Sequence, residues 1–219
     1  MITYQEIKKN KQIKTYIEKA DEVLKSLGYT EHSFAHVGIV AEKAKYILTT
    51  MGYPERMVEL AQIAGYMHDI GNIINRVDHA QSGAVMAFRI LDKLGVNAEE
   101  IAVIISAIGN HDESTAIPVN EVAAALILAD KTDVRYTRVR NRDLASFDIH
   151  DRVNYAVKES NTLINEEKTK ITLSLTIDTE FSPVMDYFEI FLERMILCKK
   201  AAEKLNLRFQ LMINGQKIL

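Results

Sequence analysis

Apolar residues recur every three or four positions through successive stretches of this chain, and this spacing constrains the fold more than any other feature. Six segments follow the pattern: residues 4–27, 31–51, 54–71, 78–94, 98–108 and the stretch after Pro118. Most of them end at a glycine, which commonly terminates a helix, and two open at a proline, which suits the first helical turn. The first two thirds of the sequence therefore predict a bundle of amphipathic helices.

The pattern changes near residue 169. The segment ITLSLTID alternates apolar and polar residues strictly, which is typical of a strand with one buried face. A helical pattern from about Pro183 to Leu205 follows, then RFQLMI alternates again, and Asn214-Gly215 favours a two-residue hairpin turn. We therefore expect a mainly α fold, with a helical body over residues 1–165 and a small C-terminal β-α-β appendage over residues 166–219.

Composition narrows the classes of function. Of the 219 residues 47% are hydrophobic, enough for a substantial core, and a net charge of −3 argues against a nucleic-acid or membrane partner. The only cysteine, Cys198, lies in a helical pattern, so we expect a buried structural thiol in a reducing compartment. The N-terminal segment has no signal-peptide pattern, and no stretch approaches the roughly 18 apolar residues of a membrane span. These features predict a cytoplasmic protein.

Several polar residues end apolar helical faces, where they need an explanation. His68-Asp69 closes the third segment, and Asp130 ends the run VAAALILAD. An ionised carboxylate that faces a core is costly unless it is paired or binds a metal. A capping or hydrogen-bonded core role would explain any one of these residues alone. Because imidazoles and carboxylates are the usual ligands of hydrolytic metals, several of them on one bundle favour a metal site.

The order of these residues resembles a known signature. HVGIVA at 36–41, MHDIGN at 67–72 and LAD at 128–130 look like the H…HD…D motif of the HD-domain phosphohydrolase superfamily. The resemblance covers most of residues 32–142. It implies an HD-domain helical bundle in which a catalytic metal is held by His36, His68, Asp69 and Asp130.

Two further segments resemble the branch of the superfamily that holds two metal ions. HAQSGA at 79–84 and NHDE at 110–113 are similar to the segments that supply extra histidine ligands there. The resemblance implies one or two divalent ions (Fe, Mn, Mg, Zn or Ni), with Asp69 bridging them and His79 and His111 completing the second site. Gly83, one turn after His79, would allow a close approach of backbones. Diadenosine tetraphosphate hydrolases and HD-GYP phosphodiesterases belong to this branch, but no GYP-bearing segment follows here, which disfavours cyclic di-GMP.

Two histidines fall outside this pattern. His32 lies one helical turn before His36, so it is either an accessory ligand or a hydrogen-bonding neighbour of the site, and we favour the second interpretation. His150, in SFDIHDR, matches no motif and is interpreted as a surface or capping residue.

The resemblance implies hydrolysis by a metal-activated hydroxide, with His68 and Asp69 as catalytic residues. Lys131, which follows Asp130, is assigned both to catalysis and to binding of the substrate phosphate. If the sixth helix continues past Lys131, one face of it would carry three further phosphate-binding candidates, Arg135, Arg138 and Arg142. The alternative interpretation is a solvated basic face that is neutralised by Asp133, Asp143 and Asp148.

The resemblance therefore implies a metal-dependent phosphohydrolase that acts on a phosphate ester or anhydride of a small molecule. The similarity to the branch with two metal ions makes a nucleotide or dinucleotide polyphosphate the first candidate, and deoxynucleoside mono- or triphosphates are the second. The acidic net charge and the lack of interleaved aromatic and basic residues disfavour RNA. The alternative is a non-catalytic sensor that binds a metal and a nucleotide. Because two or three short strands are not stable alone, the C-terminal segment could also pair with a second copy in a homodimer.

Overall fold

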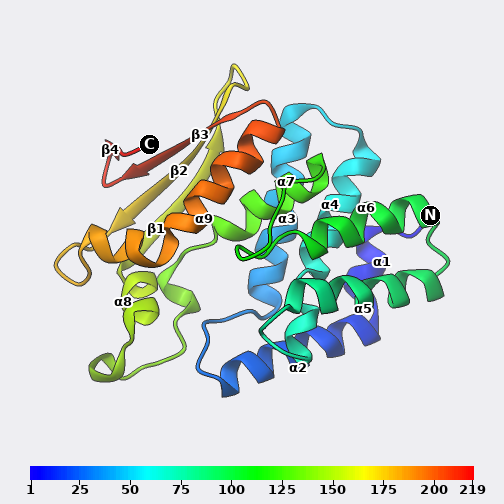
Figure 1. Cartoon of the computed structure of the whole chain (residues 1–219), viewed down its shortest axis with the longest axis horizontal. Coiled ribbons are helices and arrows are strands. Elements are labelled where there is room, and N and C mark those ends of the chain that lie inside the picture. The colour runs from blue at the N-terminus through cyan, green and yellow to red at the C-terminus, as the bar shows by residue number, and fades with distance from the viewer.

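The computed structural model describes all 219 residues, and most of them are helical. The helical body fills one side of the molecule (Figure 1). Its helices are α1 (Tyr4–Lys9), α2 (Lys11–Ser26), α3 (Phe34–Met51), α4 (Glu55–Met67), η1 (Ile70–Ile73), α5 (His79–Lys93), α6 (Ala98–Gly109) and α7 (Glu121–Lys131). The central helix α3 packs against α4 and α7, so residues far apart in the sequence meet at its surface. The predicted helical bundle is confirmed.

The first predicted helix is two helices in the structure. The chain turns at Asn10, whose backbone is extended and whose side chain accepts hydrogen bonds from the amides of Gln12 and Ile13. Asparagine is a strong helix N-cap because its side chain satisfies amides that have no partner within the helix. The apolar spacing continues across the break, since Ile7 and Ile13 are both buried. For this reason the spacing alone predicted one continuous helix.

Two glycines allow η1 and α5 to pack backbone to backbone. A Cβ atom at Gly71 would lie 2.0 Å from the carbonyl oxygen of His79 and 2.5 Å from the amide nitrogen of Gly83. A Cβ atom at Gly83 would lie 3.2 Å from the carbonyl oxygen of His68. The close approach expected at Gly83 is therefore present, and it places the start of α5 against the segment that carries His68 and Asp69.

The C-terminal part contains a four-stranded sheet of order β1-β2-β3-β4. Its elements are η2 (Tyr136–Arg138), η3 (Leu144–Ser146), α8 (Ile149–Ala156), β1 (Val157–Ile164), β2 (Lys170–Ile177), α9 (Val184–Lys204), β3 (Arg208–Ile213) and β4 (Gln216–Lys217). Strands β2 and β3 are parallel, with Leu173 opposite Leu211, and α9 connects them. The predicted β-α-β segment and the hairpin turn at Asn214-Gly215, where both φ angles are positive, match the structure.

Strand β1 was not predicted, since residues 157–164 were assigned to the helical body. It pairs antiparallel with β2 at the edge of the sheet. Only its first residue, Val157, is buried, and the following residues (KESNTLI) are exposed or half-buried. An edge strand with so little buried surface shows no apolar alternation, so the signal on which strand prediction depends is missing.

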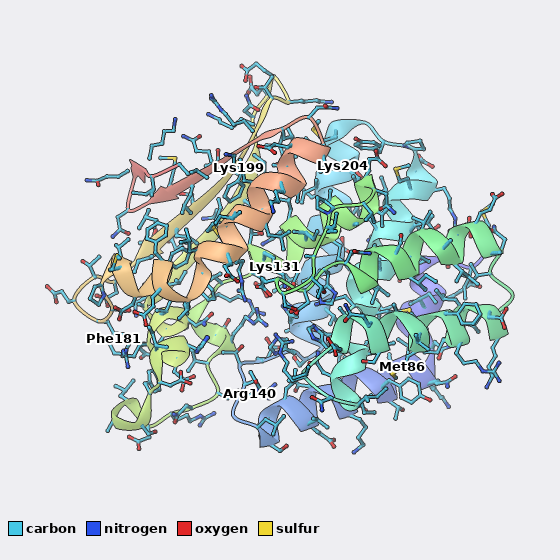
Figure 2. The ribbon with its side chains drawn as sticks, in the orientation of Figure 1. Met86, Lys131, Arg140, Phe181, Lys199 and Lys204 are labelled. Atoms are coloured by element: carbon cyan, nitrogen blue, oxygen red, sulfur yellow. The ribbon has the colours of Figure 1, made fainter.

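Helix α9 joins the sheet to the helical body. It packs against β3 and against α7, and the hydrophobic core runs through both parts of the chain. Figure 2 shows Lys131 in the middle of the molecule, where α9 meets the helical body, and Lys199 further along α9. Cys198 is fully buried, as expected, and burial raises the pKa of its thiol to about 12. None of the helices has the length and apolar character to cross a bilayer.

Candidate metal centre

Four side chains from three segments meet at the centre of the helical body. His36 extends from α3, His68 and Asp69 lie between α4 and η1, and Asp130 lies near the end of α7; all four are buried. The Nε2 atom of His36 is 3.3 Å from Asp130 Oδ1 and 3.6 Å from Asp69 Oδ2. His68 Nε2 is 3.1 Å from the same Asp69 oxygen and 3.8 Å from Asp130 Oδ1. The structure therefore brings together the four residues that the H…HD…D pattern singled out.

The imidazole rings are held so that one nitrogen points at this cluster. His68 Nδ1 lies 2.8 Å from the carbonyl oxygen of Gly65, and His36 Nδ1 lies 2.7 Å from Asp133 Oδ2. Because a carbonyl or carboxylate oxygen only accepts, Nδ1 carries the proton and Nε2 keeps its lone pair. Metal-binding histidines are usually held in this way.

The atoms that face the cluster have no hydrogen-bonding partner. His36 Nε2, His68 Nε2 and Asp69 Oδ2 are buried and unpaired. Leaving such a group unsatisfied costs about 1–3 kcal/mol each, which makes three of them in one place a costly arrangement for a protein without a ligand. Ligand atoms of His36, His68 and Asp130 all lie within 4.8 Å of one another. These residues fit a divalent cation.

A second group of residues lies on the other side of Asp69. Asp69 Oδ1 lies 3.5 Å from His79 Nε2 and 4.0 Å from His111 Nε2. The same oxygen accepts a hydrogen bond of 2.9 Å from Asn72 Nδ2. Ligand atoms of His68, Asp69 and His111 lie within 4.8 Å of one another. The two oxygens of Asp69 thus face different histidine pairs.

The contact between His79 and His111 supports a shared cation. His111 Nδ1 lies 2.6 Å from the carbonyl oxygen of Ile108, and His79 Nδ1 lies 3.0 Å from that of Arg76. Both Nε2 atoms are therefore acceptors, although they lie only 3.2 Å apart. Two lone pairs at this distance repel unless a cation or proton lies near them. Arg76 donates from Nη1 to His79 Nε2 at 3.2 Å, so the guanidinium supplies positive charge on this side.

The pKa shifts of Asp69, His79 and His111 agree with the forms in which these groups bind metals. His68 differs: burial lowers its pKa, but Asp69 and Asp130 outweigh burial and raise it. Burial is the main cause that lowers the pKa of His111 well below its usual value, and it also lowers the pKa of His79. Burial opposes ionisation of Asp69, but the neighbouring imidazoles, His68 first, outweigh it and hold the pKa of Asp69 well below its usual value. Neutral imidazoles beside an ionised carboxylate are the ligands that divalent transition metals take.

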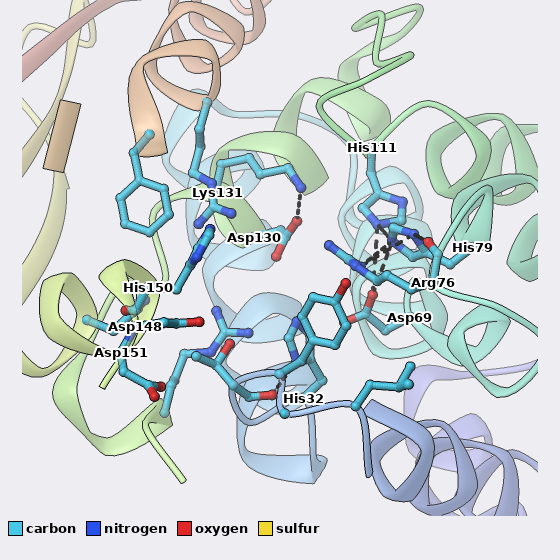
Figure 3. A pocket seen from close by; sticks show the side chains of 18 residues that line it. His32, Asp69, Arg76, His79, His111, Asp130, Lys131, Asp148, His150 and Asp151 are labelled. Carbon is cyan, nitrogen blue, oxygen red and sulfur yellow. Dashed lines mark hydrogen bonds and ion pairs between the residues drawn. The ribbon is translucent and has the colours of Figure 1, made fainter. Parts of the chain in front are cut away.

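A cavity of about 420 Å³ opens onto this cluster (Figure 3). Asp69, His79 and His111 lie at one end of it, Asp130 and Lys131 lie in the middle, and Asp148, His150 and Asp151 lie at the other end. His150 is exposed on α8, as expected of a surface residue, yet it lines this cavity. His32 also lines the cavity but belongs to neither ligand group, and its Nδ1 lies 2.7 Å from the carbonyl oxygen of Thr30.

Comparison with known proteins places this bundle in a family. The model of the HD domain matches residues 31–153, more than half of the chain. The chain belongs to the HD-domain family. The resemblance drawn from His36, His68-Asp69 and Asp130 is therefore confirmed, and the protein is a member of a superfamily of metal-dependent hydrolases.

Individual relatives are distant. An uncharacterized protein of Methanocaldococcus jannaschii is 26% identical over 159 residues, which are 63% of this chain. The chain spans only 61% of that relative's length. A crystal structure of a predicted HD superfamily hydrolase from an uncultured Thermotogales bacterium is 24% identical, with a TM-score of 0.45 over 57% of this chain and 67% of the other.

The predicted row of phosphate-binding arginines does not exist as a helical face. Helix α7 ends at Lys131, the hydroxyl of Thr132 donates to the carbonyl oxygen of Leu128, and the chain is extended by Arg135. Arg135 instead pairs with Asp133 and Glu31, and Arg142 is exposed. Neither lines the cavity. The spacing of three and four residues predicted a shared face only if the helix continued, and it does not.

Lys131 and Arg138 do line the cavity of this HD domain. Lys131 is buried and its Nζ lies 2.8 Å from Asp130 Oδ2 and 3.0 Å from Glu113 Oε2. Burial lowers the pKa of Lys131, but these two carboxylates outweigh it, so the net shift is upward and the ammonium group stays charged. Arg138 is buried and donates to the carbonyl oxygens of Glu31 and Asp133.

Three residues at the site were not singled out in the sequence. Asp133 holds His36, and Arg76 and Arg194 line the cavity. Asp133 was expected to neutralise the arginines of a basic face. It lies three residues after Asp130, and this spacing was the sequence signal that could have placed it near the metal site. Nothing in the sequence pointed to Arg194, which lies outside the residues matched by the HD domain.

Proposed function

We propose that this HD-domain protein is a metal-dependent phosphohydrolase that cleaves a phosphate ester or anhydride of a small molecule. The observation that carries the proposal is the convergence of buried, unpaired ligand atoms, His36 Nε2, His68 Nε2 and Asp69 Oδ2, in a cluster whose carboxylates, Asp69 and Asp130, line a cavity. A structural metal would not need such a cavity, whereas a hydrolytic metal must reach a substrate.

The residues would hold two divalent ions. His36, His68, Asp69 and Asp130 would bind the first, and His79, His111 and the other oxygen of Asp69 would bind the second. Bound divalent ions lower the pKa of water towards 7 and offset the charge of phosphate oxygens. The split contacts of Asp69, Oδ2 towards His36 and His68 and Oδ1 towards His79, support its role as the bridging ligand. Mixed nitrogen and oxygen donors suit Fe, Mn, Zn and Ni, and also Mg at the carboxylates.

The protein's own side chains would bind and orient the substrate. Lys131 keeps its charge beside Asp130, so its ammonium group can contact a phosphate that sits on the metal cluster. The buried Arg138 adds a second fixed cation to the cavity wall. The buried cluster keeps bulk water away, which strengthens these charge interactions.

A nucleotide is the proposed substrate class. The cavity volume falls in the range of small-molecule sites, and the rings of Tyr29 and Phe191 lie in its wall, where an aromatic base could pack. Beyond them, Asp148 and Asp151 offer acceptors for hydroxyl or amino groups of the part of the substrate that carries no phosphate.

Elemental analysis of anaerobically purified protein tests the metal assignment. We expect up to two ions per chain in the wild type, none in Asp69→Ala, and one in His79→Ala. His150→Ala is a matched control, since it removes an imidazole from the same cavity but from neither ligand group. Two ions retained in His79→Ala would exclude His79 as a ligand.

Hydrolysis assays with added Mn²⁺ or Fe²⁺ test the reaction. We expect release of phosphate from p-nitrophenyl phosphate and from members of a panel of nucleoside mono-, di- and triphosphates and dinucleotide polyphosphates, abolished in Asp69→Ala. Tight metal binding without turnover of any of these compounds would contradict the proposal and favour a non-catalytic sensor.

A further inference from the structure

Arg194 brings a cation from outside the HD domain into the cavity. It lies on α9, in the C-terminal β-α-β segment, 41 residues beyond the last residue matched by the family model at 153. Its guanidinium lines the same cavity as Asp69, His111 and Lys131. Helix α9 therefore does more than cover the helical body, because it supplies part of the cavity wall.

The guanidinium is fixed in place but has donors to spare. Its Nε donates to Glu113 Oε1 at 2.7 Å, and its Cζ lies 4.3 Å from the centre of the Phe191 ring. No protein group accepts a hydrogen bond from the terminal nitrogens Nη1 and Nη2. An arginine held through Nε and stacked on an aromatic ring presents the remaining edge of its fork as a preorganised site for an anion.

Glu113 connects this arginine to the proposed metal site. One of its oxygens accepts from Arg194, and the other accepts from Lys131 Nζ at 3.0 Å. Lys131 in turn contacts Asp130 Oδ2 at 2.8 Å. Glu113 carries one negative charge between two cations, and Asp130 balances the second cation. Once Asp130 binds a metal ion, its charge is shared with that ion, and Lys131 and Arg194 then leave an excess of positive charge in this part of the wall.

We propose that Arg194 binds the phosphate of the substrate together with Lys131, and that the cavity selects a doubly charged terminal phosphate over the singly charged phosphate of a diester. This inference rests on the proposed function and names the substrate class of the same site. The excess of positive charge in the metal-loaded site favours the anion of higher charge. The free edge of the Arg194 fork can contact two non-bridging oxygens on one phosphorus, which either anion offers, so the selectivity comes from the charge and not from the fork. The C-terminal segment is then part of the active site of this protein.

Calorimetric titration of inorganic phosphate into the Mn²⁺-loaded, full-length protein tests the proposal without turnover. Loss of one charge-assisted contact costs about 1.5–3 kcal/mol, so we expect Arg194→Gln to weaken phosphate binding about ten- to hundredfold while metal content stays the same. Lys199→Gln is the matched control: it removes an exposed cation of the same helix that does not line the cavity, and we expect no change beyond twofold.

Arg194→Lys separates a binding role from a positioning role. The lysine keeps a charge that can pair with Glu113 but lacks the fork, so we expect it to bind phosphate clearly more weakly than the wild type. Full recovery in Arg194→Lys would show that Arg194 only positions Glu113 and Lys131, and would overturn the proposal. The variant also serves if Arg194→Gln does not fold.

Two ester assays test the preference for charge. We expect Arg194→Gln to reduce kcat/KM for p-nitrophenyl phosphate at least tenfold more than kcat/KM for bis(p-nitrophenyl) phosphate. Equal losses for the two esters, or equal phosphate affinity of the wild type and Arg194→Gln, would contradict the role of Arg194. Failure of the wild type to bind phosphate in the presence of Mn²⁺ would instead contradict the proposed function itself.

Discussion

The histidine rings of this site are oriented by hydrogen bonds from Nδ1, the ring nitrogen that points away from the cluster. Each of His36, His68, His79 and His111 has Nδ1 within 3.0 Å of an oxygen, and in three cases that oxygen is a backbone carbonyl three residues earlier in the chain. His36 is the exception, since its acceptor is the carboxylate of Asp133, which adds negative charge behind the ring. Such a partner fixes the ring and makes the other nitrogen a stronger ligand.

We therefore expect Asp133→Asn to weaken metal binding about tenfold, because the amide keeps the shape of the side chain but removes its charge from His36. Titration of the metal-free protein with Mn²⁺ or Zn²⁺ measures this directly. Asp92→Asn, an exposed change on α5, is the control and should leave the affinity unchanged. Equal metal affinity of Asp133→Asn and the wild type would show that the charge of Asp133 has no influence on the site.

At the scale of elements, two features place the candidate ligands. The end of α7 at Lys131 determines which basic side chains line the cavity, because the residues after Lys131 are no longer helical and do not share a face with it. The close contact of η1 with α5 determines where His79 lies relative to Asp69. That contact depends on Gly71, because no Cβ atom fits between its Cα and the backbone of His79.

We expect Gly71→Ala to destabilise the protein by about 1–3 kcal/mol, because the added methyl group must push α5 away from η1. The same displacement moves His79 away from Asp69, so the second ion should bind more weakly than the first. Gly38→Ala is the matched control, because no atom lies within 4 Å of its Cβ position in α3. It should stabilise the protein by about 0.5–1 kcal/mol. Urea unfolding measures both, and a Gly71→Ala protein as stable as the wild type would contradict the argument.

At the scale of the whole molecule, buried charges join the two parts of the chain. Arg194 of α9, Glu113 of the segment after α6, and Lys131 of α7 form one connected group. The hydrophobic core is also continuous between them, with the buried faces of β2, β3 and α9 in the same cluster as α3 and α7. The apolar face of the sheet is thus covered within one chain, and a homodimer stays a prediction.

This connected group predicts a specific dependence of stability on pH. Burial raises the pKa of Glu113, but Lys131 and Arg194 outweigh it, so its folded-state pKa lies below the ordinary value of 4.5. A carboxyl whose pKa is lower in the folded state stabilises it fully above its unfolded pKa, and this contribution is lost as the pH falls. We expect Glu113→Gln to lower the free energy of unfolding by about 2 kcal/mol at pH 7. The difference from the wild type should shrink below about pH 4.5.

Urea unfolding of the two metal-free proteins at pH 7, 5, 4 and 3 measures this difference, and metal-free protein avoids the confounding loss of bound ions. A difference that is constant from pH 7 to pH 3 would show that the charge of Glu113 does not contribute to stability.

Most of the helices, two strands and the identity of the central cluster could be predicted from the sequence. Apolar spacing fixes the helices, since each must bury one face, and it fixes β2 and β3 through strict alternation. His36, His68, Asp69 and Asp130 could be singled out because polar residues that end apolar faces are costly without a partner. The order of these residues along the chain then sufficed to suggest the HD domain.

The contacts that support the cluster, and the cavity beside it, became visible only in the folded protein. Asp133 reaches His36 across 97 residues, and Arg194 reaches Glu113 across 81. Such pairs cannot be recognised from the spacing of residues in the sequence, because each depends on a single contact between two distant segments. Strand β1 and the end of α7 escaped prediction for a related reason: an edge strand buries almost nothing, and a helix end is set by local hydrogen bonds that the spacing of apolar residues does not record.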